Sequence, residues 1–298
     1  MMYHIPVLLN ECIEGLNIRP EGTYVDVTYG SGGHSRKILE KLTTGRLIAF
    51  DHDQDVTRNL IQDERFLFIR QNFRFVKNFL KFNGINTIDG LLADLGISSW
   101  QIDQPERGFS TRSEGPLDMR MDQGTGITAG HIINTYTAEE LSRIFRQYGE
   151  VENAWRLATE ILKERALRQI TTTGDLKQIL LRTAPRGKEN QYLAKVYQAI
   201  RIVVNEELEA LKELLKSAYE IMNPGGRLVV ISYHSLEDRL VKNYVRTGNF
   251  EGNPVKDFYG NLVVTLMPVN RKAIVPGIEE QQENPRSRSA KLRIAEKI

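Results

Sequence analysis

The first hundred residues repeat one pattern, and that pattern limits the possible folds more than any other feature of the chain. Short apolar runs that suit buried strands alternate with segments of about ten residues whose apolar positions recur at helical spacing. The strand-like runs cover residues 23–28, 46–51, 66–70 and 88–94, and the helix-like segments cover residues 34–42, 53–61 and 73–82. Because a strand, a helix and a second strand connect most readily through a right-handed crossover, the pattern predicts a parallel sheet.

The alternation breaks after residue 94 and resumes near residue 205. Glycines and prolines are frequent over residues 95–130, which we interpret as a long loop, and only helices are predicted from its end to residue 204. Asn205 suits the N-cap of the next helix, which Pro224-Gly225-Gly226 ends. The predicted elements after it are a strand over 227–232, a helix over 236–245 and strands over 262–267 and 290–295.

We therefore predict the α/β class, with one Rossmann-like and mostly parallel sheet formed by both ends of the chain. An all-helical insertion lies between its fourth and fifth strands. The predicted sheet domain comprises residues 1–104 and 200–298, and the predicted insertion domain, a loop followed by helices, comprises residues 105–199. Thr137 and Glu140 have the spacing of a capping box at the start of one insertion helix.

Cysteine content and apolar run length indicate the compartment. Cys12 is the one cysteine, so neither an internal disulfide nor a cysteine-based zinc site can form. The longest apolar runs fall far short of the roughly 20 residues of a membrane span, and no secretory signal is visible. A cytoplasmic enzyme or binding protein is expected.

Positive charge is concentrated in two segments, although the whole chain has a formal net charge of only +2. Residues 142–201 carry 12 basic and 6 acidic side chains, and residues 285–298 have a net charge of +4. A basic insertion and a basic tail favour a polyanionic partner such as a nucleic acid. The alternative is that the charges of the insertion only solvate the outer faces of its helices.

A glycine cluster directly after the first strand is the strongest local signal. Gly32, Gly33 and His34 open a helix there, and glycines let the backbone turn sharply and approach a ligand. Asp51 ends the second strand, where its carboxylate can accept both hydroxyl groups of a ribose. We predict a nucleoside-cofactor site, and the alternative is a glycine-rich turn beside a surface aspartate.

Spacing alone leaves two cofactors open. A dinucleotide fingerprint requires glycine where Ser35 stands, which disfavours a nicotinamide cofactor. S-adenosylmethionine needs a turn that admits its amino-acid tail, an acid for its ribose and an apolar contact for its adenine. Asp26, Asp51 and Phe73 could supply the acidic and apolar parts.

Asp94 ends the fourth strand and begins the segment Asp-Leu-Gly-Ile-Ser-Ser. In a doubly wound sheet, strand ends next to the switch point face the ligand crevice, so Asp94 could touch both cofactor and acceptor. Amino-group methyltransferases often have Asn/Asp-Pro-Pro-Tyr/Phe here, and this chain keeps the acid without the Pro-Pro-aromatic part. Asp94 could instead be a loop cap.

Several segments together resemble the bacterial RsmH (MraW) family, which methylates the exocyclic N4 of a cytosine in small-subunit (16S) ribosomal RNA. The segments are DVTYGSGGHS at 26–35, DLGISS at 94–99, RGFS at 107–110, GPLDMRMD at 115–122, SYHSLEDR at 232–239 and NPRSRSAKLR at 284–293. The resemblance implies a class I methyltransferase sheet, a helical insertion that recognises the substrate, and S-adenosyl-L-methionine as cofactor. The cofactor-binding residues that it implies are Gly32, Gly33, His34, Asp51, Phe73, Asp94 and Gln101.

The chemistry of this reaction assigns a role to Asp94. The lone pair of cytosine N4 is delocalised into the ring, so catalysis needs in-line placement and an acceptor for the amine proton. We hypothesise that Asp94 accepts a hydrogen bond from the amine. His234 is a second catalytic candidate, because it follows the fifth strand and could contact the base or a phosphate, and an ordinary structural role is its alternative.

RNA contacts are expected on both an aromatic side chain and the basic tail. The target base must be unstacked, and Tyr233 or Phe109 could stack on it. The tail residues expected to bind RNA are Arg286, Arg288, Lys291 and Arg293. The histidines show no metal-binding spacing, so no metal is predicted.

Two other classes of function remain open at this point. A nicotinamide-dependent dehydrogenase could use the same glycine loop, and a non-catalytic RNA-binding ribosome assembly factor could retain an unused pocket. The expected partner is ribosomal RNA or the small ribosomal subunit, with no membrane contact, and the insertion could serve RNA binding, homodimer formation or both.

Overall fold

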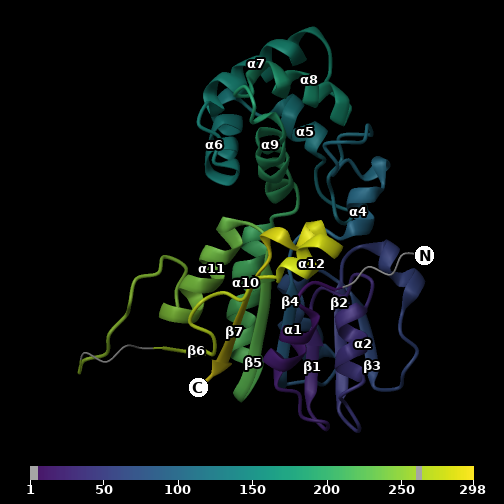
Figure 1. Cartoon of the computed structure of the whole chain (residues 1–298), viewed down its shortest axis with the longest axis vertical. Helices are drawn as coiled ribbons and strands as arrows, with labels where there is room; N and C mark the ends of the chain where they lie inside the picture. The colour runs from purple at the N-terminus through teal and green to yellow at the C-terminus, as the bar shows by residue number, and fades with distance from the viewer. Residues whose placement is uncertain (1–5, 260–263) are drawn as a thin grey trace. The chain divides into compact units, whose positions relative to one another are not determined.

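The computed structural model describes residues 6–259 and 264–298 and divides into two compact units. Figure 1 shows the whole chain. The first unit comprises Met1–Gly96 with Leu208–Ile298, and the second comprises Ile97–Glu207. A separate insertion domain at residues 105–199 stays a prediction, since these units are defined by compactness alone. Among the described residues, no helix has both the length and the apolar character needed to cross a bilayer.

The first unit is built on one sheet. Its strands are β1 (Thr23–Asp26), β2 (Arg46–Asp51), β3 (Phe66–Arg70), β4 (Ile88–Asp94), β5 (Met222–Ser232), β6 (Leu266–Pro268) and β7 (Lys291–Lys297). They lie in the order β3-β2-β1-β4-β5-β7-β6, in which β1 to β5 are parallel and β7 is antiparallel to both of its neighbours. The predicted fold class, a mostly parallel sheet with a helical insertion between strands four and five, is confirmed.

This order creates a switch point between β1 and β4. The chain proceeds from β1 to β2 and β3 on one side, and then returns to place β4 and β5 on the other. Crossover connections diverge at such a point, and doubly wound sheets bind their ligands beyond the carboxyl ends of the strands there. Asp26 ends β1 and Asp94 ends β4, so both carboxylates belong to this edge of the sheet.

Helices cover both faces of the sheet (Figure 1). Helices α1 (Leu9–Leu16) and α2 (Gly33–Leu39) share one core with the sheet, and α3 (Val76–Phe82), α10 (Glu207–Ile221) and α11 (Ser235–Thr247) share the other. The second half of strand β5 has the continuous apolar run 228–231, in which Val229 and Ile231 face the first core while Leu228 and Val230 face the second. A strand covered on both faces needs apolar residues at every position.

The second unit is helical. Its helices are α4 (Ser99–Asp103), α5 (Ala129–Thr135), α6 (Ala138–Gly149), α7 (Ala154–Leu167), α8 (Thr173–Thr183) and α9 (Glu189–Val204). Helix α9 packs against α5, α6 and α8, so it forms the centre of this unit. The predicted capping box of α6 is confirmed, because Thr137 accepts a hydrogen bond from the backbone of Glu140 and the Glu140 side chain accepts one from the backbone of Thr137.

Several expected elements differ from those observed. The helix expected over residues 53–61 is the short 3₁₀ helix η1 (Gln54–Asn59), and the loop expected over 95–130 contains α4 and the 3₁₀ turn η3 (Pro105–Arg107). Asn205 is no N-cap, since it follows α9 and its side chain bonds to the backbone of Met119 and Met121. Of the strand expected over 262–267, residues 262 and 263 lie outside the described residues.

The other short elements of the first unit precede elements of the sheet domain. Two 3₁₀ turns, η2 (Phe73–Phe75) and η4 (Pro285–Ser289), precede α3 and β7, and helix α12 (Ile278–Glu283) precedes η4. Neither α1 nor α12 was expected. Both are short, and a single amphipathic turn or two gives a weak periodic signal.

Candidate active site

The loop between β1 and α2 depends on its glycines. Gly32 has a φ of 76°, and a side-chain Cβ there would lie 2.7 Å from the Tyr29 hydroxyl oxygen. A Cβ on Gly33 would lie 2.2 Å from Cγ of Pro6, closer than any real contact. The absence of side chains therefore lets the loop turn and lets the segment around Pro6 pack on it. These two glycines were predicted as cofactor contacts, and the structure also gives them this packing role.

Asp26 is a buried carboxylate beneath this loop. Its Oδ2 accepts a hydrogen bond of 2.6 Å from the Ser35 hydroxyl, and its Oδ1 accepts one of 3.1 Å from the backbone of Thr28. Burial raises the pKa of Asp26, and these hydrogen bonds oppose the rise by favouring the charged form. The serine in the third glycine position of a dinucleotide fingerprint therefore has a structural use here, as a donor to this carboxylate.

Asp51 ties the loop to the end of β2. Its Oδ2 accepts a 2.8 Å hydrogen bond from the backbone of Gly30, and its Oδ1 accepts a 2.9 Å bond from the backbone of Asp53. Burial raises the pKa of Asp51, and these backbone donors counteract part of that rise. Because each carboxylate oxygen can accept more than one hydrogen bond, Asp51 retains acceptor capacity for hydroxyl groups of a ligand.

Asp94 is held from three directions at the end of β4. Its backbone donates to Oγ1 of Thr28 over 2.7 Å, and its Oδ1 accepts a 2.8 Å hydrogen bond from the Tyr233 hydroxyl. Its Oδ2 lies 3.9 Å from Nδ1 of His34. The side chain is still 21% exposed, so a ligand can reach a carboxylate whose orientation is already fixed.

The pKa of Asp94 is raised from its ordinary value to about 6. Burial is the main cause, and His34 and the Tyr233 hydrogen bond lower this pKa in opposition. The negative charges of Asp26 and Glu237 raise it further. Asp94 is therefore mostly ionised at neutral pH and can accept hydrogen bonds, yet it gains a proton in mildly acidic solution.

His34 connects this carboxylate to the N-terminal segment. The ring is buried, and its Nε2 lies 3.2 Å from the carbonyl oxygen of Val7. A carbonyl oxygen only accepts, so this contact requires the proton on Nε2 and turns Nδ1 towards Asp94. The carbonyl oxygen of Val7 thus fixes the orientation of a predicted cofactor-binding histidine.

Tyr233 and His234 occupy the turn between β5 and α11. Burial and the nearby Asp94 carboxylate raise the pKa of Tyr233, so its hydroxyl remains a hydrogen-bond donor at neutral pH. His234 caps α11, because its Nδ1 accepts a 3.4 Å hydrogen bond from the backbone of Glu237. The Glu237 carboxylate accepts 2.9 Å and 3.3 Å bonds from the backbones of Tyr233 and His234. His234 therefore has a structural role in the turn that presents Tyr233.

Other predicted site residues lie farther from these contacts or in the second unit. Phe73 begins η2 after β3 and packs partly buried against the core of the first unit. Gln101 belongs to the second unit, where its side chain forms a capping box with Ser98 at the start of α4. Phe109 belongs to the core of that unit, with only 7% of its surface exposed.

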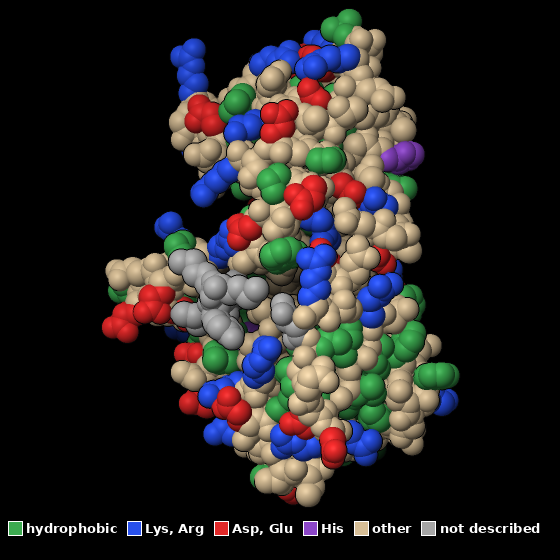
Figure 2. Space-filling model, turned by 90° about the vertical axis from the view of Figure 1, so that its right-hand side faces the viewer, with side chains coloured by type: hydrophobic (Ala, Val, Ile, Leu, Met, Phe, Trp, Pro, Cys, Tyr) green, Lys and Arg blue, Asp and Glu red, His purple; other side chains and the backbone are tan. Residues whose placement is uncertain are grey.

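The basic tail carries exposed side chains, and two of its cations lie near the carboxylate of Asp238. Arg286 and Arg288 are exposed in η4, whereas Nε of Arg293 donates a 2.7 Å hydrogen bond to Oδ1 of Asp238. Lys291 is partly exposed and lies 3.6 Å from the same carboxylate. Figure 2 shows cationic and anionic side chains interspersed on the face in view.

Three contacts of this site were missed from the sequence. Thr28 and Ser35 both lie in the glycine-rich segment, but their bonds to Asp94 and Asp26 were not foreseen. The Thr28 bond could have been suspected, because Thr28 follows β1 and Asp94 ends β4, the parallel neighbour of β1. The Tyr233–Asp94 hydrogen bond could also have been suspected, because both residues follow the ends of adjacent parallel strands.

The sheet order, with its switch point and with carboxylates around a glycine-rich turn, is that of a Rossmann-like fold of the class I methyltransferase type. The model of the MraW methylase family matches residues 1–298. The chain therefore belongs to the MraW methylase family. It is a methyltransferase, and the nicotinamide-dependent dehydrogenase and the non-catalytic assembly factor are set aside.

Individual relatives agree with this family over their full length. The chain is 54% identical over 297 residues to the ribosomal RNA small subunit methyltransferase H of Phocaeicola vulgatus, covering 99% of this chain and 98% of the relative. It is 55% identical over 298 residues to the protein of the same name from Cytophaga hutchinsonii, covering 99% and 100%. A solved rRNA methylase from Streptococcus thermophilus aligns over 100% of this chain and 99% of its own at 12% identity with a TM-score of 0.44, a likeness too distant to carry an argument.

Proposed function

We propose that this methyltransferase transfers a methyl group from S-adenosyl-L-methionine to the exocyclic N4 of a cytidine in the 16S ribosomal RNA of the small subunit. The curated relatives are named as ribosomal RNA small subunit methyltransferases. The observation that carries the proposal is the partly exposed Asp94 carboxylate, fixed by Tyr233 at the switch point of the sheet. An amine acceptor needs such a hydrogen-bond acceptor beside it.

The charge of the site suits a cationic donor. Asp26, Asp51 and Asp94 are the last residues of β1, β2 and β4, and a pyrophosphate would meet repulsion from these carboxylates. A sulfonium ion is attracted by the same field. The donor, when bound, supplies a methyl group activated by the positive sulfur.

Individual residues have distinct parts in holding the donor. Asp51 would hold the ribose hydroxyl groups, and the turn at Gly32 and Gly33 would admit the amino-acid tail. Phe73 would give adenine an apolar contact. Gln101, His34 and Asp94 complete the proposed binding set.

Asp94 also acts on the acceptor in this proposal. Its ionised carboxylate accepts a hydrogen bond from the N4 amine, which localises the nitrogen lone pair and directs it at the methyl carbon. The N4–H bond breaks as the new N–C bond is completed, and Asp94 is placed to receive the proton. Tyr233 donates to Oδ1 throughout, so it is a positioning residue for the carboxylate.

The RNA contacts in this proposal extend beyond the reacting base. The target cytosine leaves its stack to reach Asp94, and the ring of Tyr233 is the aromatic surface on which it could stack. The exposed Arg286 and Arg288, with Lys291 and Arg293, would contact phosphates near the crevice. The helical second unit would recognise the substrate, and a ribosomal substrate implies a cytoplasmic reaction. His234 would contact the RNA directly in this proposal, in addition to capping α11.

The test is methyl transfer by an Asp94→Asn variant. Small subunits from cells that lack this protein are incubated with radiolabelled S-adenosylmethionine, and the nucleosides are identified by mass spectrometry. We expect N4-methylcytidine from the parent protein and a loss of about 100-fold or more in kcat for the variant, because the acceptor is lost. Glu251→Gln, which removes an exposed carboxylate, is the matched control and retains full activity. Normal turnover by Asp94→Asn, or methylation at a ring carbon, contradicts the proposal.

A further inference from the structure

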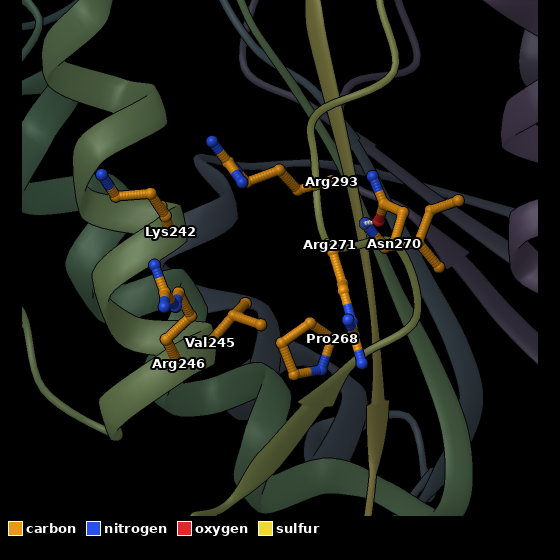
Figure 3. Close-up of a pocket in the computed structure, with 8 residues that line it drawn as sticks. Lys242, Val245, Arg246, Pro268, Asn270, Arg271 and Arg293 are labelled. Atoms are coloured by element: carbon orange, nitrogen blue, oxygen red, sulfur yellow. Dashed lines mark hydrogen bonds between the residues drawn. The ribbon is translucent and has the colours of Figure 1, made fainter. Parts of the chain in front are cut away.

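A cationic cavity lies in the first unit, away from the residues assigned to methyl transfer. It has a volume of about 280 Å³ and lies between α11 and the segment that joins β6 to β7. Figure 3 shows Lys242 and Arg246 on the helix and Arg271 and Arg293 on the opposite wall. Four cationic side chains from elements far apart in sequence thus converge on one small space.

Most of this positive charge is not neutralised by the protein. Among the described residues, Lys242, Arg246 and Arg271 form no ion pair, whereas Arg293 donates through Nε to Asp238. Like charges that share a small space repel one another, so the cavity has a positive potential that an anion relieves. Arginine stays charged at any physiological pH, so this potential persists under all ordinary conditions.

The frame around the cavity is held firmly enough to be a preformed site. The Asn270 side chain donates to the carbonyl of Lys272 over 2.7 Å and accepts a 2.7 Å bond from the backbone of Ile294. It therefore fastens the segment that carries Arg271 to β7. Val245 and Ile294 provide apolar lining beneath the charges. The cations consequently face a space whose walls do not need to be ordered by a ligand.

An RNA strand whose target base enters the active site could also reach this cavity. Helix α11 begins at Ser235, two residues after Tyr233, whose hydroxyl bonds to Asp94. At 1.5 Å per residue, Lys242 and Arg246 lie roughly 10 Å and roughly 17 Å along the helix from its start. That separation corresponds to a few nucleotides of an RNA strand.

We propose that this cavity binds a backbone phosphate of the substrate RNA, a few nucleotides from the cytidine that is methylated. Its size admits one phosphate group with its ribose, and the arginine side chains match the geometry of phosphate oxygens. The contact reads no base, so it sets the register of the strand while the active site reads the cytosine. This inference rests on the proposed RNA substrate.

The test is an Arg246→Gln/Arg271→Gln double variant, compared with Lys41→Gln/Lys81→Gln. Both pairs remove two exposed positive charges from the first unit, and only the first pair lines the cavity. Binding of a 20-nucleotide single-stranded RNA centred on the methylated cytidine is measured by fluorescence anisotropy at several salt concentrations. Each lost phosphate contact lowers the slope of log K against log salt by about 0.7, so the cavity variant, which loses its one phosphate contact, should show a slope lower by about 0.7.

The accompanying measurements separate this inference from the proposed function. The cavity variant should keep the parent affinity for S-adenosylmethionine in calorimetry and the parent kcat, with a raised KM for RNA. A salt slope equal to that of the lysine control overturns the inference, and so does competition by millimolar inorganic phosphate without any effect of the variant on RNA binding. Failure of the parent protein to methylate RNA instead overturns the proposed function, and the inference with it.

Discussion

Replacing Tyr233 by phenylalanine removes one hydrogen bond from the Asp94 carboxylate and leaves the ring in place. The bond is 2.8 Å long and is accepted by a charged group, so it contributes about 1.5–3 kcal/mol, and the partial exposure of Asp94 favours the lower value. One pKa unit corresponds to about 1.4 kcal/mol. The pKa of Asp94, which is about 6 in the intact site, should therefore rise by about one unit in the variant.

The assay is kcat/KM for methyl transfer measured from pH 5.5 to pH 9, since this ratio reports groups of the free enzyme. If the ionised form of Asp94 is required, activity rises with pH through about 6 in the parent protein and reaches a plateau above it. In Tyr233→Phe the same limb moves up by about one unit, so activity falls about threefold at pH 6.5 and recovers at pH 8.5. Tyr259→Phe, at an exposed tyrosine, is the matched control and leaves the profile unchanged.

A different outcome refutes this reasoning in a specific way. A loss that is equal at every pH means that Tyr233 does not act through the ionisation of Asp94. If that loss falls entirely in the KM for RNA, the stacking role predicted from the sequence is the better account. An unchanged profile means that the hydrogen bond has no part in catalysis.

Two further predictions concern stability. The raised pKa of Asp94 makes the folded state bind protons more tightly than the unfolded chain between pH 4 and about 6, so the free energy of unfolding falls as pH rises through this window. Urea unfolding should therefore find Asp94→Asn more stable than the parent by up to about 3 kcal/mol at pH 7.5. No such gain is expected near pH 4. Gly33→Ala should reduce the free energy of unfolding by about 1–3 kcal/mol, because its Cβ would overlap Pro6, whereas Gly277→Ala, where no atom lies within 4 Å, should leave it unchanged. Equal stabilities across pH for the first, or equal effects of both alanines, would contradict these arguments.

The strands of the sheet were predictable because local signals and tertiary burial agree in them. The predicted runs 46–51, 66–70 and 88–94 coincide with β2, β3 and β4 to the residue. Each is an apolar run with a charged or polar residue at an end, and β2 and β4 are buried on both faces, as inner strands of a parallel sheet are. Helical segments were less well bounded, since residues 53–61 carry too little periodic signal to separate a 3₁₀ helix from an α-helix.

The sequence predicted where the site residues lie along the strands, but it did not predict which residues they contact. Motif spacing identified Asp51 and Asp94 at strand ends, and both are there. The partner of Asp94 depends on the pairing of β4 with β5, which aligns Asp94 with Ile231 and brings Tyr233 alongside. That register joins segments separated by the whole helical insertion. The capping role of His234 was not predicted for a different reason. Histidine is an unusual N-cap residue, and the residues around it gave no other sign of a cap.

The carboxylates of this site lower the stability of the folded chain, and they also determine which ligand charge is favoured. Burial raises the pKa of Asp26, Asp51 and Asp94 despite the donors around them, so their negative charge is not fully compensated within the folded chain. A neutral ligand gains nothing from this field, and an anionic one is repelled. In the proposed function, a sulfonium donor would recover part of the electrostatic energy, and it would lose that attraction once its methyl group has been transferred and its sulfur is neutral. The same charges that weaken the fold would therefore bind the cationic donor more tightly than its product. The product would then be replaced readily by a new donor molecule.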